Sequence, residues 1–212
     1  MASVHMLAAP PWISTNSGYW RVESKSGGSA MKLWIRLPRL DVNQNSRSGC
    51  QLTRATRSAL KRVHSGTEYW VAALGFWPGL CSLMPLDPRS RLVAPKYNPP
   101  RTWTPKGTIG HGGAITCIYP DRTPGGYQIF ARTPMPIWDR EQRLAAFKDS
   151  LALFRAGDRV RFIPIDREEW DAIDATVADG SYRHPNVDYQ KFSIGKYRQW
   201  LAELEAGRGR HA

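Results

Sequence analysis

The spacing of hydrophobic positions changes along the chain and predicts different elements in different regions. From Gln51 to Val63, apolar residues fall loosely on one face and cationic residues lie outside it, which predicts a short amphipathic helix. Residues Tyr69 to Phe76 are aromatic and aliphatic and are bounded by glycine, which predicts a buried strand. Prolines and glycine pairs divide Thr108–Tyr119 and Tyr127–Thr133 into segments too short for helices, so both are predicted as strands. The middle of the chain is therefore all-β in character.

The C-terminal third has a different period. Apolar residues recur at helical spacing from Glu141 to Phe154, which predicts a helix, and a strand is expected over Arg159–Ile165. Asp166 followed by Glu169 resembles a capping box and predicts the start of another helix. A last helix is expected from Ser193, so the chain should end in a helical tail.

The first 48 residues show no sustained period and are rich in Pro, Gly, Ser and Asn, which is typical of extended or poorly ordered chain. One short strand is expected, from Met31 to Leu37. The pattern thus predicts three parts: an irregular region over residues 1–50, a β domain over 51–165 and a helical extension over 166–212.

The net charge of +12 suggests a nucleic-acid partner, but its distribution argues against one. Residues 1–66 hold 10 Lys and Arg against 2 Asp and Glu, residues 67–135 hold 7 against 3, and residues 136–212 hold 13 against 13. The excess lies in the region with the weakest folding signals, and no nucleic-acid-binding motif accompanies it. We therefore expect no nucleic-acid partner.

The three cysteines have no paired spacing, which favours neither a disulfide framework nor a metal site. Reduced cysteines are expected, with Cys81 and Cys117 in the core. No apolar run reaches the ~18 residues that a membrane helix needs, and Met1–Ile13 lacks the features of a secretory signal. The expectation is a cytoplasmic protein with no metal and no membrane partner.

Candidate chemistry concentrates in residues 95–133. There the glycine pairs Gly112-Gly113 and Gly125-Gly126 lie close to cationic and aromatic residues in the sequence. Such backbone can be approached closely by a ligand, and the cations can hold an anionic group. The competing interpretation is structural, with the glycine pairs in tight turns and the tyrosines in the core or a barrel wall.

Several ordered blocks of this stretch and its surroundings resemble one family. The Gly75–Leu80 turn resembles a Gly-Phe-x-Pro-Gly-Phe motif, and the later blocks are Lys96–Gly107, Gly110–Gly113 with Ile118-Tyr119, Pro124–Gln128 and Arg132-Thr133. Over residues 51 to 206 the chain is similar to the C-terminal part of the carboxyltransferase region of urea carboxylase. That region belongs to the wider family of allophanate hydrolase subunit 1 and the B subunit of 5-oxoprolinase.

The resemblance implies a mainly β fold, a cyclophilin-like β-barrel with peripheral helices and a helical C-terminal tail. It implies a component that moves a carboxyl group from carboxybiotin to urea or a related amide or guanidine compound. Biotin would be carried by a partner domain, and ATP would be used only by a partner biotin carboxylase or subunit. The implied partners are the other carboxyltransferase half, the biotin carboxylase and the biotin carrier, so the chain is expected to be inactive alone.

Carboxyl transfer needs cationic or amide donors for a carboxylate and for the biotin ureido oxygen. Charged side chains, uncrowded backbone N–H groups and a group that moves a proton from the acceptor nitrogen are therefore the candidates. The expected catalytic residues are His111 or Tyr119. The expected binding residues are Lys96, Asn98, Arg101, Gly112, Gly113, Gly125, Gly126, Tyr127 and Arg132.

Two departures from the family leave alternatives open. His111 occupies a position where the family has a small or aliphatic residue, so it is either a replacement or a ligand contact. Upstream of Gln51 nothing matches, so residues 1–50 belong to an extension or the chain is a fragment. The alternative functions are a subunit of ATP-dependent 5-oxoprolinase or allophanate hydrolase, a non-catalytic binding module like the kinase inhibitor of this fold, and a truncated inactive copy.

Overall fold

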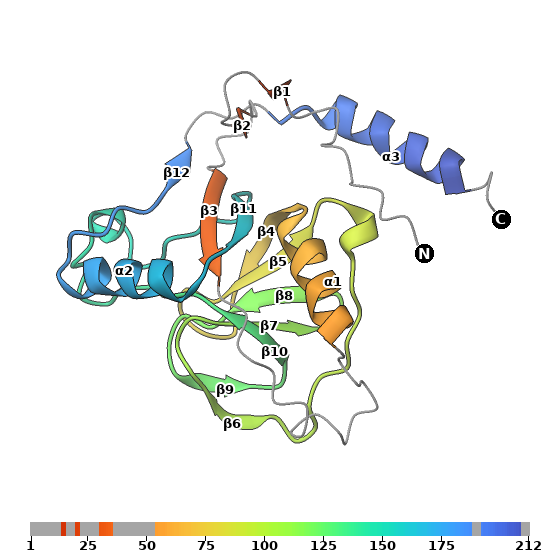
Figure 1. Ribbon diagram of the computed structural model, residues 1–212. Helices are drawn as coiled ribbons and strands as arrows, with labels where there is room; N and C mark the ends of the chain where they lie inside the picture. Colours follow the sequence, from red (N-terminus) through yellow and green to blue (C-terminus); the bar gives the residue numbers. More distant parts are fainter. Residues whose placement is uncertain (1–13, 16–19, 22–29, 36–53, 188–191, 209–212) are drawn as a thin grey trace. The chain divides into compact units, whose positions relative to one another are not determined.

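A computed structural model describes residues 14–15, 20–21, 30–35, 54–187 and 192–208. Two compact units are present, one formed by residues 30–186 and the other by residues 1–29 and 187–212. The larger unit holds most of the regular structure (Figure 1).

An eight-stranded sheet forms the centre of the larger unit, with the strand order β10-β7-β8-β5-β4-β11-β3-β12. Six neighbouring strands, from β10 to β11, are antiparallel and form a curled half-barrel, whereas β3 joins β11 in parallel. The fold is thus mixed α/β with helices in the C-terminal region. The bounds of these strands are β3 Ala30–Ile35, β4 Glu68–Leu74, β5 Cys81–Pro85, β7 Thr108–Gly112, β8 Ile115–Ile118, β10 Gln128–Arg132, β11 Arg159–Pro164 and β12 Asn186–Val187.

A two-stranded ribbon of β6 (Arg101–Thr104) and β9 (Thr123–Gly125) lies beside the main sheet (Figure 1). Single turns of 3-10 helix occur at Pro88–Ser90 and Ala145–Phe147. The helix α1 (Arg54–Ser65) precedes β4, and α2 (Arg167–Ala178) follows β11. These positions confirm the predicted helix near residue 51 and the strands of the middle region.

The core of the larger unit lies on one face of the half-barrel and combines aliphatic and aromatic side chains. Tyr69, Leu83, Ile109, Ile118 and Phe162 are each at most 1% exposed. Alternate residues of β4, β5 and β11 point into this core, as the two-residue period of a strand requires. Cys81 and Cys117 are both free and buried, which confirms their expected place.

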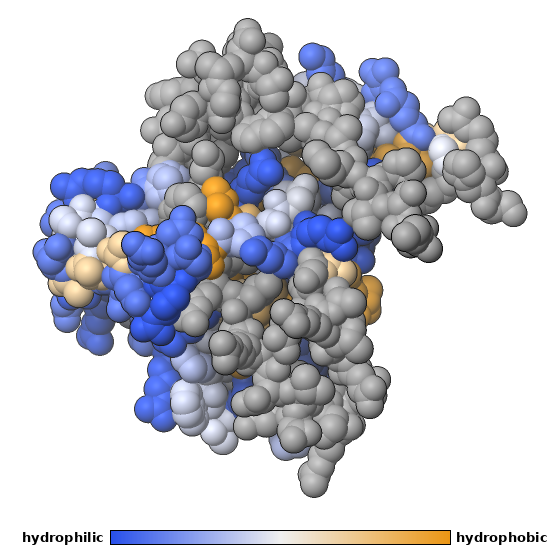
Figure 2. Space-filling view, in the orientation of Figure 1, coloured by the Kyte–Doolittle hydropathy of each residue, from blue (hydrophilic) through white to orange (hydrophobic). Residues whose placement is uncertain are grey.

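The helix α2 begins where the capping box predicts. The Asp166 carboxylate accepts a hydrogen bond from the Glu169 N–H at 2.9 Å, and the Glu169 carboxylate accepts one from the Asp166 N–H at 3.0 Å. Ile173 and Val177 pack against the core, while the side of α2 turned to the viewer is largely hydrophilic (Figure 2). Gly180, with φ of 82°, follows its end.

The helix predicted over Glu141–Phe154 is wrong. The segment is an irregular loop with one 3-10 turn, Ala145–Phe147, and an isolated bridge between Trp138 and Ala152. The buried Asp139 carboxylate accepts hydrogen bonds from the backbone N–H groups of Glu141 and Arg143, and Gln142 has a positive φ of 52°. These side-chain contacts stabilise a turn that competes with helix formation.

The smaller unit contains β1 (Ser14–Thr15) paired with β2 (Trp20–Arg21), and α3 (Ile194–Arg208). The helix α3 confirms the expected last helix. The strand β3 confirms the strand expected near Met31, and most of the remaining N-terminal region predicted to be irregular lies outside the described residues.

Candidate functional site

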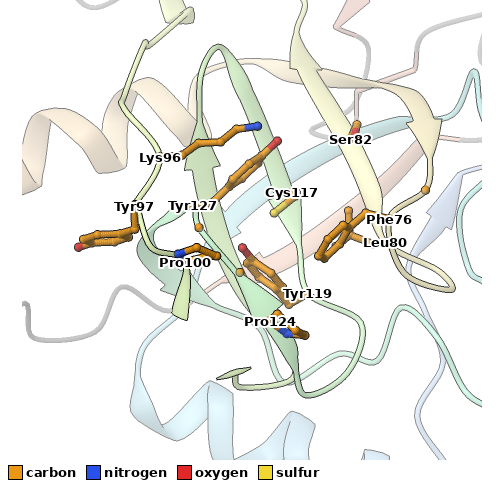
Figure 3. A pocket seen from close by; sticks show the side chains of 13 residues that line it. Phe76, Leu80, Ser82, Lys96, Tyr97, Pro100, Cys117, Tyr119, Pro124 and Tyr127 are labelled. Carbon is orange, nitrogen blue, oxygen red and sulfur yellow. The ribbon is translucent and has the colours of Figure 1, made fainter. Parts of the chain in front are cut away.

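A cavity of about 550 Å³ opens beside strand β8 and is lined by most of the aromatic residues of the motif region. Figure 3 shows Phe76 and Leu80 on one side and Lys96 and Pro100 on the other, with Tyr119, Tyr127 and Cys117 between them. The lining residues are Gly75, Phe76, Leu80, Ser82, Lys96, Tyr97, Pro100, Cys117, Tyr119, Pro124, Gly125, Gly126 and Tyr127.

Two tyrosines form the inner wall, and glycines make room for both of them. A Cβ placed on Gly125 would overlap the phenol of Tyr119, and a Cβ on Gly112 would lie 2.5 Å from the Tyr127 ring. Gly110 is also close, because its Cβ would lie 2.9 Å from the Tyr127 Cβ. The sequence leads us to expect backbone donors to a ligand at Gly112 and Gly125. In the structure, the missing side chains of both glycines also leave the room that the tyrosine rings occupy.

The backbone of Tyr119 is fixed on both sides. Its N–H donates to the Thr108 carbonyl at 2.8 Å, and its carbonyl accepts from the Gly107 N–H at 2.8 Å. Its phenol lies next to the Tyr127 backbone and the Cys117 thiol. The two backbone hydrogen bonds therefore define where the Tyr119 ring enters the cavity.

Burial keeps the titratable groups of the inner wall neutral. Desolvation, followed by the neighbouring Cys117, raises the pKa of Tyr119 to about 12. The same two causes raise the pKa of Tyr127, and burial raises the pKa of the Cys117 thiol. At neutral pH both phenols carry their protons and can donate hydrogen bonds to an anion or a carbonyl oxygen.

Positive charge reaches the cavity through Lys96. Its Nζ lies 5.2 Å from the centroid of the Tyr127 ring, which is a cation–π distance. Arg101 lies on β6 with its guanidinium carbon 5.3 Å from the centroid of Tyr97. The Arg101 guanidinium also approaches the Thr104 hydroxyl at 3.4 Å.

Arg132 points to a different part of the surface. Its Nε donates to the Lys106 carbonyl at 3.0 Å, and its guanidinium carbon lies 5.9 Å from the Trp170 ring centroid. Arg132 is not part of the cavity lining, and neither is Asn98, whose side chain is exposed. The expected binding residues Arg101, Gly112 and Gly113 lie outside the lining as well, so the structure places only Lys96, Gly125, Gly126 and Tyr127 of the expected binding set around the cavity.

His111 also lies outside the cavity lining, and both of its ring nitrogens are engaged. Nε2 donates to the Leu92 carbonyl at 2.9 Å, so Nδ1 accepts from the Thr116 hydroxyl at 3.0 Å. Burial lowers the pKa of this imidazole. In this arrangement His111 connects β7, β8 and the segment that leads to Lys96.

The second glycine pair contributes to the cavity, whereas Gly113 does not. The Gly113 N–H donates to the Ala94 carbonyl at 2.8 Å, so this donor is already used. The Gly126 carbonyl accepts from the Tyr97 N–H at 2.7 Å, and both Gly125 and Gly126 line the cavity. This contact holds the Lys96–Pro100 segment against the tyrosine wall.

Eight lining residues are not among the site residues expected from the sequence: Gly75, Phe76, Leu80, Ser82, Tyr97, Pro100, Cys117 and Pro124. Ser82 and Cys117 are register partners on β5 and β8, which a sequence pattern does not reveal. Phe76 and Leu80 belong to the Gly75–Leu80 motif, so the motif itself is the available signal.

The lining therefore combines neutral phenol donors, one ammonium group and apolar ring surface. Such a site suits a flat, partly apolar molecule that carries carbonyl or carboxylate oxygens. Within the described ranges, no group of three or more His, Cys, Asp or Glu side chains is placed to hold a metal ion. Among the helices of the same ranges, none has the length and apolar character that a membrane crossing demands.

Residues 42–147, half of the chain, match the model of the carboxyltransferase domain, subdomains C and D. Urea amidolyase of Saccharomyces cerevisiae is 40% identical over 136 residues, which are 63% of this chain and 7% of that protein. The B subunit of 5-oxoprolinase from Bacillus subtilis is 34% identical over 110 residues, or 52% of this chain and 42% of that protein.

Among solved structures, the urea carboxylase of Kluyveromyces lactis superposes with a TM-score of 0.72 and 27% identity. The superposition covers 89% of this chain and 18% of that one. The chain thus spans less than half of each of these relatives. The match over residues 42–147, supported by these relatives, shows that the chain belongs to the carboxyltransferase domain family, in its subdomains C and D.

Proposed function

We propose that this chain is the substrate-side component of a biotin-dependent carboxyltransferase, which moves a carboxyl group from carboxybiotin to urea or a related amide or guanidine compound. The observation that carries the proposal is the cavity in which Lys96, Tyr119 and Tyr127 meet, within the segment that resembles urea carboxylase and urea amidolyase. In this proposal the half-barrel corresponds to the cyclophilin-like barrel expected from the sequence.

The residues of the cavity fit a ureido ring and a carboxylate. The Tyr119 phenol lies where a Cβ of Gly125 would be, and the aromatic walls suit the apolar faces of a fused ring. When bound, carboxybiotin supplies the activated carboxyl group. The phenols of Tyr119 and Tyr127 donate hydrogen bonds to oxygen atoms, and the Lys96 ammonium neutralises carboxylate charge.

A proton must leave the acceptor nitrogen, and Tyr119 is the candidate that lies in the cavity. Because its pKa is raised to about 12, the phenol keeps its proton at neutral pH. It would act as a relay, accepting the proton of the acceptor nitrogen while passing its own to the ureido group that has lost its carboxyl group. His111 is assigned a positioning role, since its hydrogen bond to the Leu92 carbonyl anchors the segment that carries Lys96.

Other polypeptide segments must complete the reaction. The chain covers 18% of the Kluyveromyces lactis urea carboxylase, so the proposed partners are the other carboxyltransferase half, the biotin carboxylase and the biotin carrier. ATP would be consumed by the biotin carboxylase. Alone, the chain is expected to have no carboxyltransferase activity.

The test is complementation of a urea carboxylase from which the aligned segment has been deleted. The full chain is added in trans, and in a second arm it replaces the deleted segment in a chimera. Urea-dependent and bicarbonate-dependent ATP hydrolysis should return in at least one arm. If the added chain and the chimera are both folded, each binds the rest of the carboxylase, and both remain inactive, the catalytic proposal fails.

A second candidate is a subunit of ATP-dependent 5-oxoprolinase, because the B subunit of 5-oxoprolinase from Escherichia coli O157:H7 is 39% identical over 102 residues. The Lys96–Gly107 run favours the urea-carboxylase branch, which it resembles more closely. The chain can be added to a 5-oxoprolinase that lacks its B subunit. If 5-oxoproline-dependent ATP hydrolysis returns, the 5-oxoprolinase assignment would be favoured over the urea-carboxylase assignment.

A further inference from the structure

The turn between β4 and β5 holds an aromatic residue in an unfavourable backbone conformation. Phe76 has φ of 71°, in the left-handed region that suits glycine and is an outlier for a bulky side chain. Hydrogen bonds close the turn, from the Gly75 N–H to the Leu80 carbonyl at 3.1 Å and from the Leu80 N–H to the Trp77 carbonyl at 3.0 Å. The backbone of the turn thus fixes Phe76 in this conformation.

Burial of the ring does not explain why phenylalanine occupies this position. Phe76 is 74% exposed, so most of its apolar surface stays in water. Glycine lies on either side, at Gly75 and at Gly79, and Gly79 is itself required because its Cβ would lie 2.7 Å from Trp138. A strained and exposed aromatic residue contributes little to folding, which points to a role in contact with another molecule.

The position of the Phe76 ring indicates which molecule it would contact. Phe76 lines the cavity together with Leu80, on the side opposite Lys96, with Tyr119 and Cys117 between them (Figure 3). Leu80 is only 6% exposed and packs with Cys117 and Tyr119, so it belongs to the fixed wall. Among the lining residues, Phe76 is the large hydrophobic side chain that is exposed, so its surface is available to a molecule in the cavity.

We propose that Phe76 is a specificity-determining residue of the cavity, held in a strained backbone conformation so that its ring contacts the apolar part of the ligand. The inference deepens the proposed function and rests on it where the ligand is the biotin group. In the cavity, Lys96 and the phenols receive the oxygen atoms of the ligand, and Phe76 covers its hydrocarbon portion.

Two variants that both lack the ring separate strain from contact. In Phe76→Gly the strain is removed, whereas in Phe76→Ala it is kept, so the glycine variant should melt about 2–4 °C above the alanine variant. At an ordinary position the order is reversed, because glycine makes the unfolded chain more flexible. Differential scanning fluorimetry of the full chain measures this difference.

The same variants test contact through the affinity of two probes. The first is biocytin, followed by saturation-transfer NMR, and the second is 1-anilino-8-naphthalenesulfonate, followed by its fluorescence. Both Phe76 variants should bind roughly 10-fold more weakly than the wild-type chain, as expected for loss of one aromatic contact. The control is Trp77→Ala, which removes an aromatic ring from the same turn but outside the cavity lining and should leave affinity within twofold.

The outcomes distinguish the two proposals. If biocytin does not bind the wild-type chain but the sulfonate probe binds and is lost in both Phe76 variants, the biotin assignment fails and the role of Phe76 stands. If Phe76→Ala melts at or above Phe76→Gly, or if the Phe76 variants keep wild-type affinity for the probes, the role of Phe76 is refuted. If neither probe binds the wild-type chain, both proposals fail.

Discussion

The phenol of Tyr119 occupies the space that a side-chain carbon of Gly125 would need. Gly125 lies on β9 and Tyr119 follows β8, so a missing side chain on one strand determines the position of a functional group beside another. The glycines of the motif therefore lie where aromatic rings need room, as well as where a ligand can approach the backbone.

Replacing Gly125 by alanine should displace Tyr119. Neither the backbone that carries the new Cβ nor the buried phenol can move freely, so we expect a loss of about 1–3 kcal/mol in the free energy of unfolding. Urea denaturation measures it. The control is Gly75→Ala, where no heavy atom lies within 4 Å of the added carbon. Equal stabilities of the two variants would refute the seating role of Gly125.

Replacing Tyr119 by phenylalanine should affect activity far more than stability. The ring is kept and only the hydroxyl group is lost, so the free energy of unfolding should change by no more than about 1.5 kcal/mol. In the complemented urea carboxylase, kcat should fall roughly 10²–10³-fold, because a hydrogen-bond donor in the cavity is missing. The same change at Tyr197, outside the cavity lining, should leave kcat unaffected. A kcat that is unchanged in Tyr119→Phe would remove Tyr119 from the mechanism.

Glu68 is expected to be essential for stability because it pairs with a buried guanidinium. The Arg159 side chain is 3% exposed and its NH1 lies 3.2 Å from the Glu68 carboxylate. Burial lowers the pKa of Arg159, and Glu68 opposes this shift. The substitution Glu68→Gln removes the carboxylate that pairs with this buried cation and should cost about 3 kcal/mol in unfolding experiments.

The matched control for this pair is Asp171→Asn, which breaks the exposed Arg167–Asp171 pair on α2. Solvent screens that pair, so the unfolding midpoint should hardly move. A comparable loss in the two variants would show that the burial of Arg159 does not matter.

Acid should destabilise the fold through His64. Burial, followed by the neighbouring His111, lowers the pKa of His64 from 6.5 to about 3, and its Nδ1 lies 2.6 Å from the Tyr69 hydroxyl. The unfolded chain therefore takes up the proton first, so this contribution to stability is complete above pH 6.5 and is lost as the pH falls towards 3.

At pH 5 the loss from His64 should be about 2 kcal/mol relative to neutral pH. Urea denaturation between pH 7 and pH 5 measures it, and His64→Leu should show a flatter dependence. His111 and His184, whose pKa values are also lowered mainly by burial, add to the effect in the same direction. A pH dependence that does not change in His64→Leu would contradict the assignment.

Elements with strong local signals could be predicted from the sequence. The capping box at Asp166 and Glu169 sets the start of α2, and the glycines and prolines around Thr108–Thr133 divide that region into strands. The segment from Glu141 to Phe154 could not be predicted this way. Leu144, Phe147 and Phe154 are buried at helical spacing, but they reach the core from a loop whose turns depend on the buried carboxylate of Asp139.

The site was predictable to the extent that its residues belong to one motif region. Lys96, Tyr119, Gly125, Gly126 and Tyr127 do line the cavity. Ser82 and Cys117 join the lining because β5 pairs with β8. His111 and Arg132 lie outside it and instead donate hydrogen bonds to the Leu92 and Lys106 carbonyls, which are distant in sequence. Pairing registers and such long-range hydrogen bonds arise only in the folded chain.

The parallel pairing of β3 with β11 has a consequence for the order of assembly. It joins Ala30 to Arg159, on either side of the family segment at residues 42–147. During synthesis β3 leaves the ribosome first and must wait for this partner while the hairpins of the half-barrel form, since closing so long a loop is slow. We expect nascent chains that end before residue 159 to bind chaperones, and longer chains to resist proteolysis only once β11 has emerged.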